Sequence, residues 1–318
     1  MKLLVTQLIL SVMCLSACCL NAQADGVTFA EQPEGRLQVM IDGKDFCTFN
    51  TGDQWNKPFV FPMHTASEKN VLRTIVPTQA EQGSAKDGTD HFHHKGVWVG
   101  VDSVNDEKLN FWHEESRVDC QKIEHTVAEN GVGIVTLTSV WLQEDKPLMN
   151  EVTQYTIHPN RLLTCRIELS AVDRDVTFHD TKEGFFAVRV AHSMREMEGG
   201  RISNAEGLKG EKDCWGKTSP WVDYVGEVDG QTVGVALMDA PENFRKSRYH
   251  VRAYGLFAIS PFGPSRYSNG RETESPVTLS PGKENLKLTY GLYVHDGDTE
   301  AGGVAAAYQQ FLKAVAPK

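Results

Sequence analysis

The 318-residue sequence predicts an all-β fold, a large antiparallel β-sandwich with one C-terminal helix. Apolar and polar residues alternate in many short segments, as they do in strands with one buried face and one solvated face. Turn dipeptides separate several of these segments, and short turns favour antiparallel pairing. Only the last segment has clear helical spacing. Together these three observations predict many short strands within a single domain.

The strands are predicted in chain order from these patterns. Alternation is clearest at 163–170 and 286–294, and a shorter run opens the mature chain at 37–42. Further strands are predicted at 71–76, 97–102, 132–142, 151–157, 186–192, 222–228, 232–238 and 251–258. The turn signals are Asn130-Gly131, Asp229-Gly230 and Asn269-Gly270.

The one predicted helix lies at the C-terminus and is amphipathic. Its residues at helical spacing are Val304, Tyr308, Phe311, Leu312 and Val315. Asp298 or Thr299 is expected to cap its first turn, because both side chains accept hydrogen bonds from exposed backbone N–H groups. We expect this helix to cover a face or an edge of a sheet.

The N-terminus has the layout of an export signal. Lys2 supplies the positive charge and an apolar run follows to Leu15, which is too short to cross a bilayer. Two cleavage sites remain open. An ordinary site after Ala24 removes residues 1–24, whereas a lipobox removes residues 1–17 and leaves a lipid anchor at Cys18. Residues 25–318 then form one exported domain, without a membrane span, in the periplasm or at the cell surface.

The net charge and the cysteines restrict the partners and the chemistry. The formal net charge is −10, which opposes binding to nucleic acid or to anionic lipid. The mature chain retains Cys47, Cys120, Cys165 and Cys214, without the short spacing of a redox or zinc motif. We expect these cysteines to be mostly buried small side chains, and leave open whether any two form a disulfide.

The densest group of titratable residues is the sequence His91-Phe92-His93-His94. If this segment is extended, His91 and His93 share one face. Their imidazoles suit a divalent metal or proton transfer near neutral pH, with Asp87, Asp90 and His64 as further ligands or orienting groups. A hydrogen-bonded histidine cluster with only a structural role is the alternative.

Aromatic residues lie beside charged and polar ones in several segments that do not alternate simply. Such combinations suit a sugar, whose C–H face packs on an aromatic ring while its hydroxyl groups form hydrogen bonds. The alternative is that each tryptophan belongs to the core. The four tryptophans next to polar motif residues are Trp98, Trp112, Trp215 and Trp221.

The ordered motifs resemble a known bacterial family. They read K-P-F-V-F-P, D-H-F-H-H-K-G-V-W, N-F-W, E-G-F-F-A-V-R-V-A, W-G-K-T-S-P-W-V-D-Y, P-E-N-F-R and H-V-R-A-Y-G-L-F-A. In this order they resemble an exported family of unknown function that is commonly labelled "methane oxygenase PmoA". The resemblance runs from about Pro58 to the terminal helix. It implies no established catalytic residues, and this chain has Phe92 where the family usually has proline.

The first functional hypothesis is an exported carbohydrate-active enzyme that acts on a sugar, glycoside or oxidised sugar by acid–base chemistry. Its architecture is expected to resemble the galactose mutarotase superfamily, which does not fix the function. The predicted catalytic residues are His91, His93, Glu183, Arg189, His250 and Arg252, with His91 and His93 also as ligands of a possible divalent metal. The predicted substrate-binding residues are Trp98, Trp112, Trp215 and Asn243.

The second hypothesis is a noncatalytic glycan-binding or structural sandwich that uses the same aromatic and arginine side chains. The two hypotheses differ in what the histidines do. We expect the segments of His93, Trp215 and His250 to converge at one concave face. We also expect Glu183 and Arg189 to share a strand face and to bracket a cleft.

Overall fold

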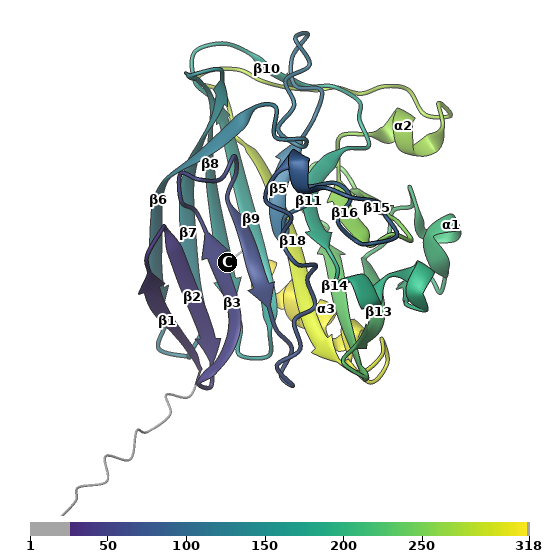
Figure 1. The fold of residues 1–318 in the computed structure, drawn as a ribbon. Coiled ribbons are helices and arrows are strands. Elements are labelled where there is room, and N and C mark those ends of the chain that lie inside the picture. The colour runs from purple at the N-terminus through teal and green to yellow at the C-terminus, as the bar shows by residue number, and fades with distance from the viewer. Residues whose placement is uncertain (1–25, 317–318) are drawn as a thin grey trace, which may run out of the picture.

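The computed structural model describes residues 26–316, which form two large sheets packed as a sandwich (Figure 1). The first sheet has eight strands in the order β1 (Val27–Gln32), β2 (Arg36–Ile41), β3 (Lys44–Asn50), β4 (Phe59–Met63), β5 (Val97–Val101), β11 (Gly184–Arg189), β16 (Leu256–Ser260) and β15 (Arg248–Val251). The second has eight in the order β12 (Arg201–Asn204), β13 (Trp221–Val228), β14 (Gln231–Asp239), β18 (Leu286–Asp296), β9 (Leu162–Ala171), β8 (Lys146–Ile157), β7 (Gly133–Gln143) and β6 (Arg117–Val127). A small sheet pairs β10 (Val176–Phe178) with β17 (Val277–Leu279).

The strand pairs described in all three sheets are antiparallel. The helices are α1 (Gly210–Cys214), α2 (Pro264–Ser268) and α3 (Val304–Val315), with 3₁₀ turns η1 (Gln79–Glu81), η2 (His192–Met194) and η3 (Glu196–Glu198). The predicted all-β antiparallel sandwich with a C-terminal helix is therefore confirmed. No helix within residues 26–316 is long and apolar enough to cross a membrane.

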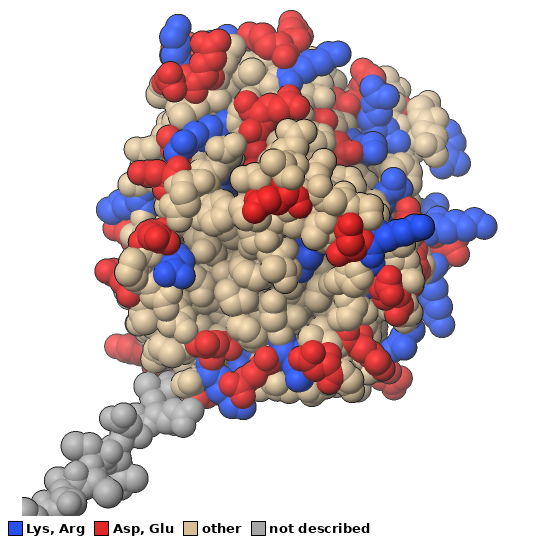
Figure 2. All heavy atoms as spheres, viewed as in Figure 1, with Lys and Arg blue, Asp and Glu red and all other residues tan. Residues whose placement is uncertain are grey.

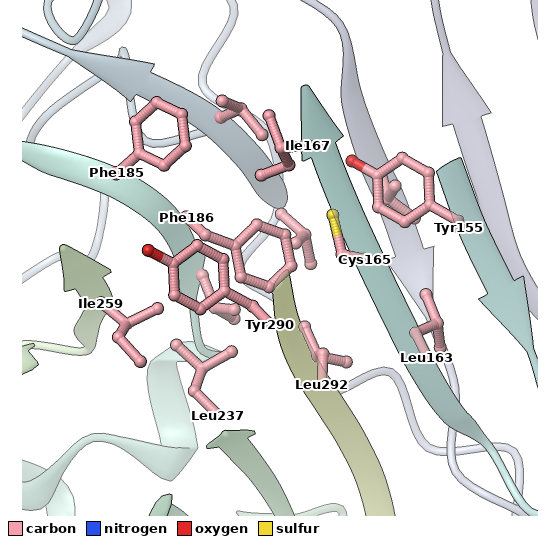
Figure 3. Close-up of a cluster of buried hydrophobic side chains, with 14 of the residues drawn as sticks. Tyr155, Leu163, Cys165, Ile167, Phe185, Phe186, Leu237, Ile259, Tyr290 and Leu292 are labelled. Atoms are coloured by element: carbon pink, nitrogen blue, oxygen red, sulfur yellow. The ribbon is translucent and has the colours of Figure 1, made fainter. Parts of the chain in front are cut away.

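The main core lies between the two large sheets and follows from the alternation in the sequence. Leu163, Cys165 and Ile167 on β9 point into it, where they meet side chains from β11 and β18 (Figure 3). There Phe186 stacks on Tyr290 with ring centroids 5.7 Å apart. Burial of each large apolar side chain contributes about 1.5–3 kcal/mol. This core is therefore the main source of stability.

The outer face of the second sheet, which we call the helix face, is covered by α3 (Figure 1). On β14, Ala236 and Met238 alternate with the core residues, so they point outward and contact this helix. Phe311 is the largest side chain that α3 buries there. Small residues on the strands give the helix room to approach the sheet. The helix thus covers a sheet face, as the sequence predicts.

The outer face of β5, β11, β16 and β15, which we call the site face, is also buried, but by loops and polar side chains. Strand register places one row of residues on this face: Trp98, Ala187, Ala258 and His250. The two alanines in the middle leave space above the sheet, and larger side chains such as Trp112 and Tyr254 pack there. Because both faces of these strands are buried, their sequences are nearly continuously apolar.

Several details of the strand prediction are wrong. The segment 71–76 is not a strand. It lies beside the end of β11 and has only one isolated bridge, between Leu72 and Val190. The segment 251–258 is a hairpin between β15 and β16, with its turn at Gly255 (φ 96°). The strand predicted at 186–192 is displaced, since β11 ends at Arg189. Both Phe185 and Phe186 enter the core, which breaks the predicted alternation along β11.

One turn prediction holds only in part and the cap prediction is wrong. Asn269-Gly270 forms a turn, as predicted, but it ends α2 in a left-handed conformation and connects no hairpin. Gly303 precedes α3 and no side chain caps the helix. Asp298 instead accepts hydrogen bonds from the backbone of the preceding turn, and Thr299 donates to Asp223. The turns at Asn130-Gly131 and Asp229-Gly230 do connect adjacent strands, as predicted.

The signal segment, 1–24 or 1–17, and the predicted anchor at Cys18 lie outside the described residues. The four described cysteines are free, and all but Cys120 are buried. On the face shown in Figure 2, acidic and basic side chains are interspersed around the margin, with no large field of one sign.

Candidate functional site

Buried cations hold the loop at residues 90–95, which we call the histidine loop. Arg73 donates hydrogen bonds to the backbone carbonyl oxygens of Asp90, His91 and His94. Lys57 donates to the carbonyl oxygen of His93 at 2.9 Å. Buried carbonyl groups need such partners where no neighbouring strand supplies an N–H group. The shape of this loop therefore depends on residues far from it in the sequence.

His91 is the most exposed histidine of the loop, and a carboxylate orients its ring. Its Nδ1 donates to Asp90, whose other carboxylate oxygen accepts a 2.7 Å hydrogen bond from Arg189. The ring stacks on His94 at 4.8 Å and on Tyr254 at 5.1 Å. With Nδ1 held by the carboxylate, Nε2 is the ring nitrogen left for another partner. His91 is thus held in one orientation by contacts on both ring faces and at one edge.

The predicted convergence of His91 and His93 on one face of an extended segment is wrong. His91 has a φ of 52°, so the chain turns there. The rings of His91 and His94 are parallel, whereas the ring of His93 lies across them at 80° and 81°. Alternate residues share a face only in an extended backbone.

His93 and His94 are buried and remain neutral near pH 7. Burial, together with the positive charges of Lys57 and His113, lowers the pKa of His93 to about 2. Burial also lowers the pKa of His94 well below its usual value. His94 accepts a 3.0 Å hydrogen bond at Nδ1 from Arg189, because a guanidinium can only donate. Its role is to position Arg189, whereas Nε2 of His93 has no partner.

His250 on β15 is a further neutral imidazole of the site face. Its Nδ1 donates to the carbonyl oxygen of Lys182 at 2.9 Å, because that oxygen can only accept. Nε2 therefore carries the lone pair, and it is buried without a partner. Burial lowers the pKa of His250 to about 4, although the neighbouring Glu183 opposes this shift.

Glu183 lies next to this imidazole, with its Oε2 3.8 Å from Nδ1 of His250. Burial alone would raise the pKa of Glu183, but His250 and Lys182 outweigh it and lower the pKa. Lys182 pairs with the carboxylate at 3.0 Å. Glu183 is therefore ionised near pH 7 while His250 is neutral. A carboxylate beside an unprotonated imidazole is an arrangement suited to accepting protons.

His113 lies beside the histidine loop, and Trp215 lies beside His250. The ring of His113 is 4.5 Å from that of His93, and its charge helps to lower the pKa of Glu183. The ring of Trp215 lies 6.3 Å from that of His250. The segments of His93, Glu183, His250 and Trp215 thus meet on the site face, although they are far apart in the sequence.

Unpaired polar atoms are concentrated in this region. Among the described residues, thirteen buried side-chain nitrogen or oxygen atoms have no hydrogen-bond partner. Seven of them belong to the site: the side-chain nitrogens of Arg73, His93, Trp98, Arg189, Trp215, His250 and Arg252. A buried polar group without a partner is destabilising and indicates strain or a ligand-binding role. The clustering favours a ligand.

The four predicted sugar-binding residues do not share one environment. Trp98 and Trp112 are buried, with exposed fractions of 1% and 0%, so neither offers a ring face to a sugar. Asn243 bonds internally to Asp239 and to the backbone of Thr289, and has no described contact with the site. Only Trp215 is partly exposed and next to the titratable groups.

The two predicted catalytic arginines also differ. Arg189 is fully buried, with its guanidinium 4.9 Å from the ring of Tyr254, and so it lies below the surface and does not bracket a cleft with Glu183. Arg252 is partly exposed and pairs with Glu211 at 2.8 Å. Arg189 therefore positions other residues, whereas Arg252 can reach a ligand.

A metal centre at His91 and His93 gains no support from the geometry. Within residues 26–316, no group of three or more histidine, cysteine, aspartate or glutamate side chains is arranged to hold a metal ion. Nδ1 of His91 is occupied by Asp90, and the two rings are perpendicular. The donor set therefore fits an oriented base better than a metal site.

His113 and Tyr254 were not predicted from the sequence as site residues, and Asp90, which was predicted only as a further ligand or orienting group of the histidines, also pairs with Arg189. His113 and Tyr254 stand within motifs that were recognised, but the positions of their rings depend on loops that pack across the sheet. The signal that could have identified them is their place beside tryptophan and arginine in those motifs.

The fold and the site together define an antiparallel β-sandwich with a cluster of buried histidine, arginine and glutamate side chains on one outer face. The chain belongs to a family of unknown function (DUF6807), whose model matches residues 36–309. This agrees with the resemblance to an uncharacterised family, but it does not support the methane-oxygenase label. No curated protein matched the sequence.

Two solved structures have a similar arrangement of strands. Galactose 1-epimerase from Lactobacillus acidophilus NCFM matches at 10% identity and a TM-score of 0.41, over 86% of this chain and 100% of that chain. The 4-alpha-glucanotransferase from Thermococcus litoralis matches at 9% identity and a TM-score of 0.36, over 85% of this chain and 39% of that chain. At these scores neither structure indicates what this chain binds.

Proposed function

We propose that this chain is an exported enzyme that acts on a sugar or an oxidised sugar by acid–base chemistry. The observation that carries the proposal is the neutral imidazole of His250, whose Nε2 has no partner, beside the ionised carboxylate of Glu183. Groups with shifted pKa values and unpaired buried atoms gather at functional sites more often than elsewhere. Export is inferred from the pattern of the first 24 residues.

The arrangement favours removal of a proton from carbon next to a carbonyl or carboxylate group. Glu183 or Nε2 of His250 accepts the proton, since both are unprotonated near pH 7. Arg252, which is partly exposed, stabilises the negative charge that develops on the substrate oxygen. His91 supplies a second oriented imidazole, stacked on Tyr254. Elimination or epimerisation of an oxidised sugar uses this kind of step.

A noncatalytic glycan-binding role is less consistent with the geometry. A binding platform requires exposed aromatic rings, and Trp98 and Trp112 are buried. Recognition alone also gives no reason to bury Nε2 of His93 and Nε2 of His250 without partners. The enzyme proposal accounts for both observations.

The test is turnover of a panel of uronides, keto-sugars and neutral glycosides by the full mature chain. We expect Glu183→Gln and His250→Asn each to lower kcat/KM by about 10²-fold or more, which is the usual contribution of a general base. We also expect activity to fall as the pH decreases toward about 4, where His250 becomes protonated. Circular dichroism and thermal melting check that the variants fold.

The matched control is Glu284→Gln, which removes one exposed carboxylate from a loop outside the site. It should leave kcat/KM unchanged. If a saccharide binds to the wild type and to Glu183→Gln with the same affinity, and neither protein transforms any member of the panel, the chain is a binding module and the proposal is wrong.

A further inference from the structure

A pocket of about 380 Å³ opens beside the Glu183–His250 pair, on the other side of Trp215. Tyr267 also lines this pocket, and its hydroxyl donates to the carbonyl oxygen of Lys182 that accepts from His250. The pocket volume lies within the range of about 300–1,000 Å³ that is common for small-molecule sites. One wall of the pocket is thus part of the support of the candidate site.

The charge of this pocket is opposite to that of the whole chain. Its lining contains four cations, Lys212, Lys217, Arg248 and Arg271, and one acid, Glu272. Arg248 pairs with Glu272, whereas no ion pair of the other three cations occurs among residues 26–316. The chain as a whole carries a formal charge of −10. A local excess of positive charge in an acidic protein attracts an anionic ligand.

Trp215 adds an independent observation that points to a ligand. Its indole Nε1 is buried and has no hydrogen-bond partner. The residue is nevertheless partly exposed and lines the pocket. An aromatic face with a free N–H donor beside unpaired cations matches a sugar ring that carries a negative group, because the ring packs on the indole and the anion meets the cations.

We propose that the pocket at Trp215, Lys212, Lys217 and Arg271 binds the carboxylate of an acidic saccharide and so selects uronic-acid substrates for the neighbouring site. This inference rests on the proposed function, and it specifies the substrate class. The pocket holds the anionic group of one sugar unit, while an adjoining unit extends past Trp215 toward His250.

The test is calorimetric titration of the full mature chain with glucuronate, glucose and inorganic sulfate. We expect glucuronate to bind at least about tenfold more tightly than glucose, with an affinity that falls as salt is added. The double variant Lys212→Gln/Lys217→Gln should weaken glucuronate binding by about tenfold or more and leave glucose binding unchanged. The control is Lys283→Gln/Lys287→Gln, which removes the same charge from exposed positions outside the pocket and should bind glucuronate as the wild type does.

The outcomes separate the pocket from the chemistry. Equal affinity for sulfate and glucuronate would show a site for free anions and overturn the saccharide assignment. Equal loss of binding in both double variants would show an effect of net charge, which also overturns it. If the pocket variants lose glucuronate binding while His250→Asn keeps full turnover, the pocket stands and the proposed function fails. If His250→Asn loses turnover while the pocket variant binds glucuronate as the wild type does, the proposed function stands and the pocket proposal fails.

Discussion

Each large sheet buries a histidine on its outer face, and the two environments are opposite. On the helix face, both nitrogens of His295 have partners, Asp223 at 3.1 Å and the carbonyl oxygen of Asp296 at 3.3 Å. On the site face, Nε2 of His93 and of His250 have none. The helix face is thus closed mainly by apolar packing and its histidine is fully paired, although the buried hydroxyl of Thr164 there has no partner, whereas seven unpaired nitrogen atoms gather on the site face.

The pKa values follow the same contrast. Burial alone would lower the pKa of His295, but the hydrogen bond and charge of Asp223 outweigh it and raise the pKa. Burial lowers the pKa of His93 and of His250, and at His250 the charge of Glu183 and the hydrogen bond to Lys182 offset only part of this shift. A buried histidine is therefore part of a structural ion pair on the helix face, whereas buried histidines on the site face keep a nitrogen that can accept a proton. The presence of a partner, more than burial, distinguishes the two.

The largest expected effect is on the charged group that supports the site face. Asp90 is buried between Arg189 and His91, and these two lower its pKa although burial alone would raise it. The variant Asp90→Asn leaves Arg189 and Arg73 buried without a compensating negative charge. We expect the free energy of unfolding to fall by about 3–5 kcal/mol, measured by urea denaturation.

The control for this variant is Asp106→Asn, which removes a carboxylate whose side chain is fully exposed. It should change the free energy of unfolding by less than about 0.5 kcal/mol. If the two variants were equally stable, the contrast between the faces would not rest on a charged network, and the orientation of His91 would need another explanation.

The fold class could be predicted because one-sided burial leaves a clear period in the sequence. The segments 163–170 and 286–294 alternate, since only one face of each strand meets the main core over most of its length. The segment 71–76 was mistaken for a strand because it is apolar, yet its backbone meets β11 only at single positions. Apolar composition alone does not distinguish a buried loop from a buried strand.

The site could be predicted only in part. Titratable residues that stand beside aromatic and apolar residues, such as Glu183 and His250, can be recognised in the sequence. The orientation of aromatic rings does not, so buried Trp98 could not be told from partly exposed Trp215. The role of Tyr254 and the pairing of Asp90 with Arg189 depend on contacts between segments that are distant in the sequence, and no local pattern specifies such contacts.

The next effect concerns the paired histidine of the helix face and depends on pH. The pKa of His295 is raised in the folded state, so its pairing with Asp223 contributes fully below the unfolded pKa of about 6.5 and is lost as the pH rises through the folded pKa. We expect Asp223→Asn to be less stable than the wild type by about 2 kcal/mol at pH 6. The difference should shrink at pH 9, as measured by thermal or urea unfolding.

The wild type measured at the same two pH values is the reference for Asp223→Asn, because the other groups titrate equally in both proteins. Asp229→Asn, which changes a largely exposed carboxylate, should show the same small difference from the wild type at pH 6 and pH 9. A gap between Asp223→Asn and the wild type that widened with pH would mean that His295 is neutral in the folded protein, and the proposed contrast between the faces would be lost.

The smallest expected effect on stability is that of removing an unpaired imidazole from the site face. In His93→Leu, a buried nitrogen without a partner is replaced by an apolar group of similar size, so we expect the free energy of unfolding to change by less than about 1 kcal/mol in either direction. The matched change His295→Leu leaves Asp223 buried without its charge partner and with only the hydrogen bond from Thr299, and should cost about 3 kcal/mol or more. Measured side by side by urea denaturation, similar losses in the two variants would show that His93 is held by interactions as strong as those of His295. A stable His93→Leu variant that has also lost turnover would instead show that the site face retains its unpaired histidines for function, at the expense of stability.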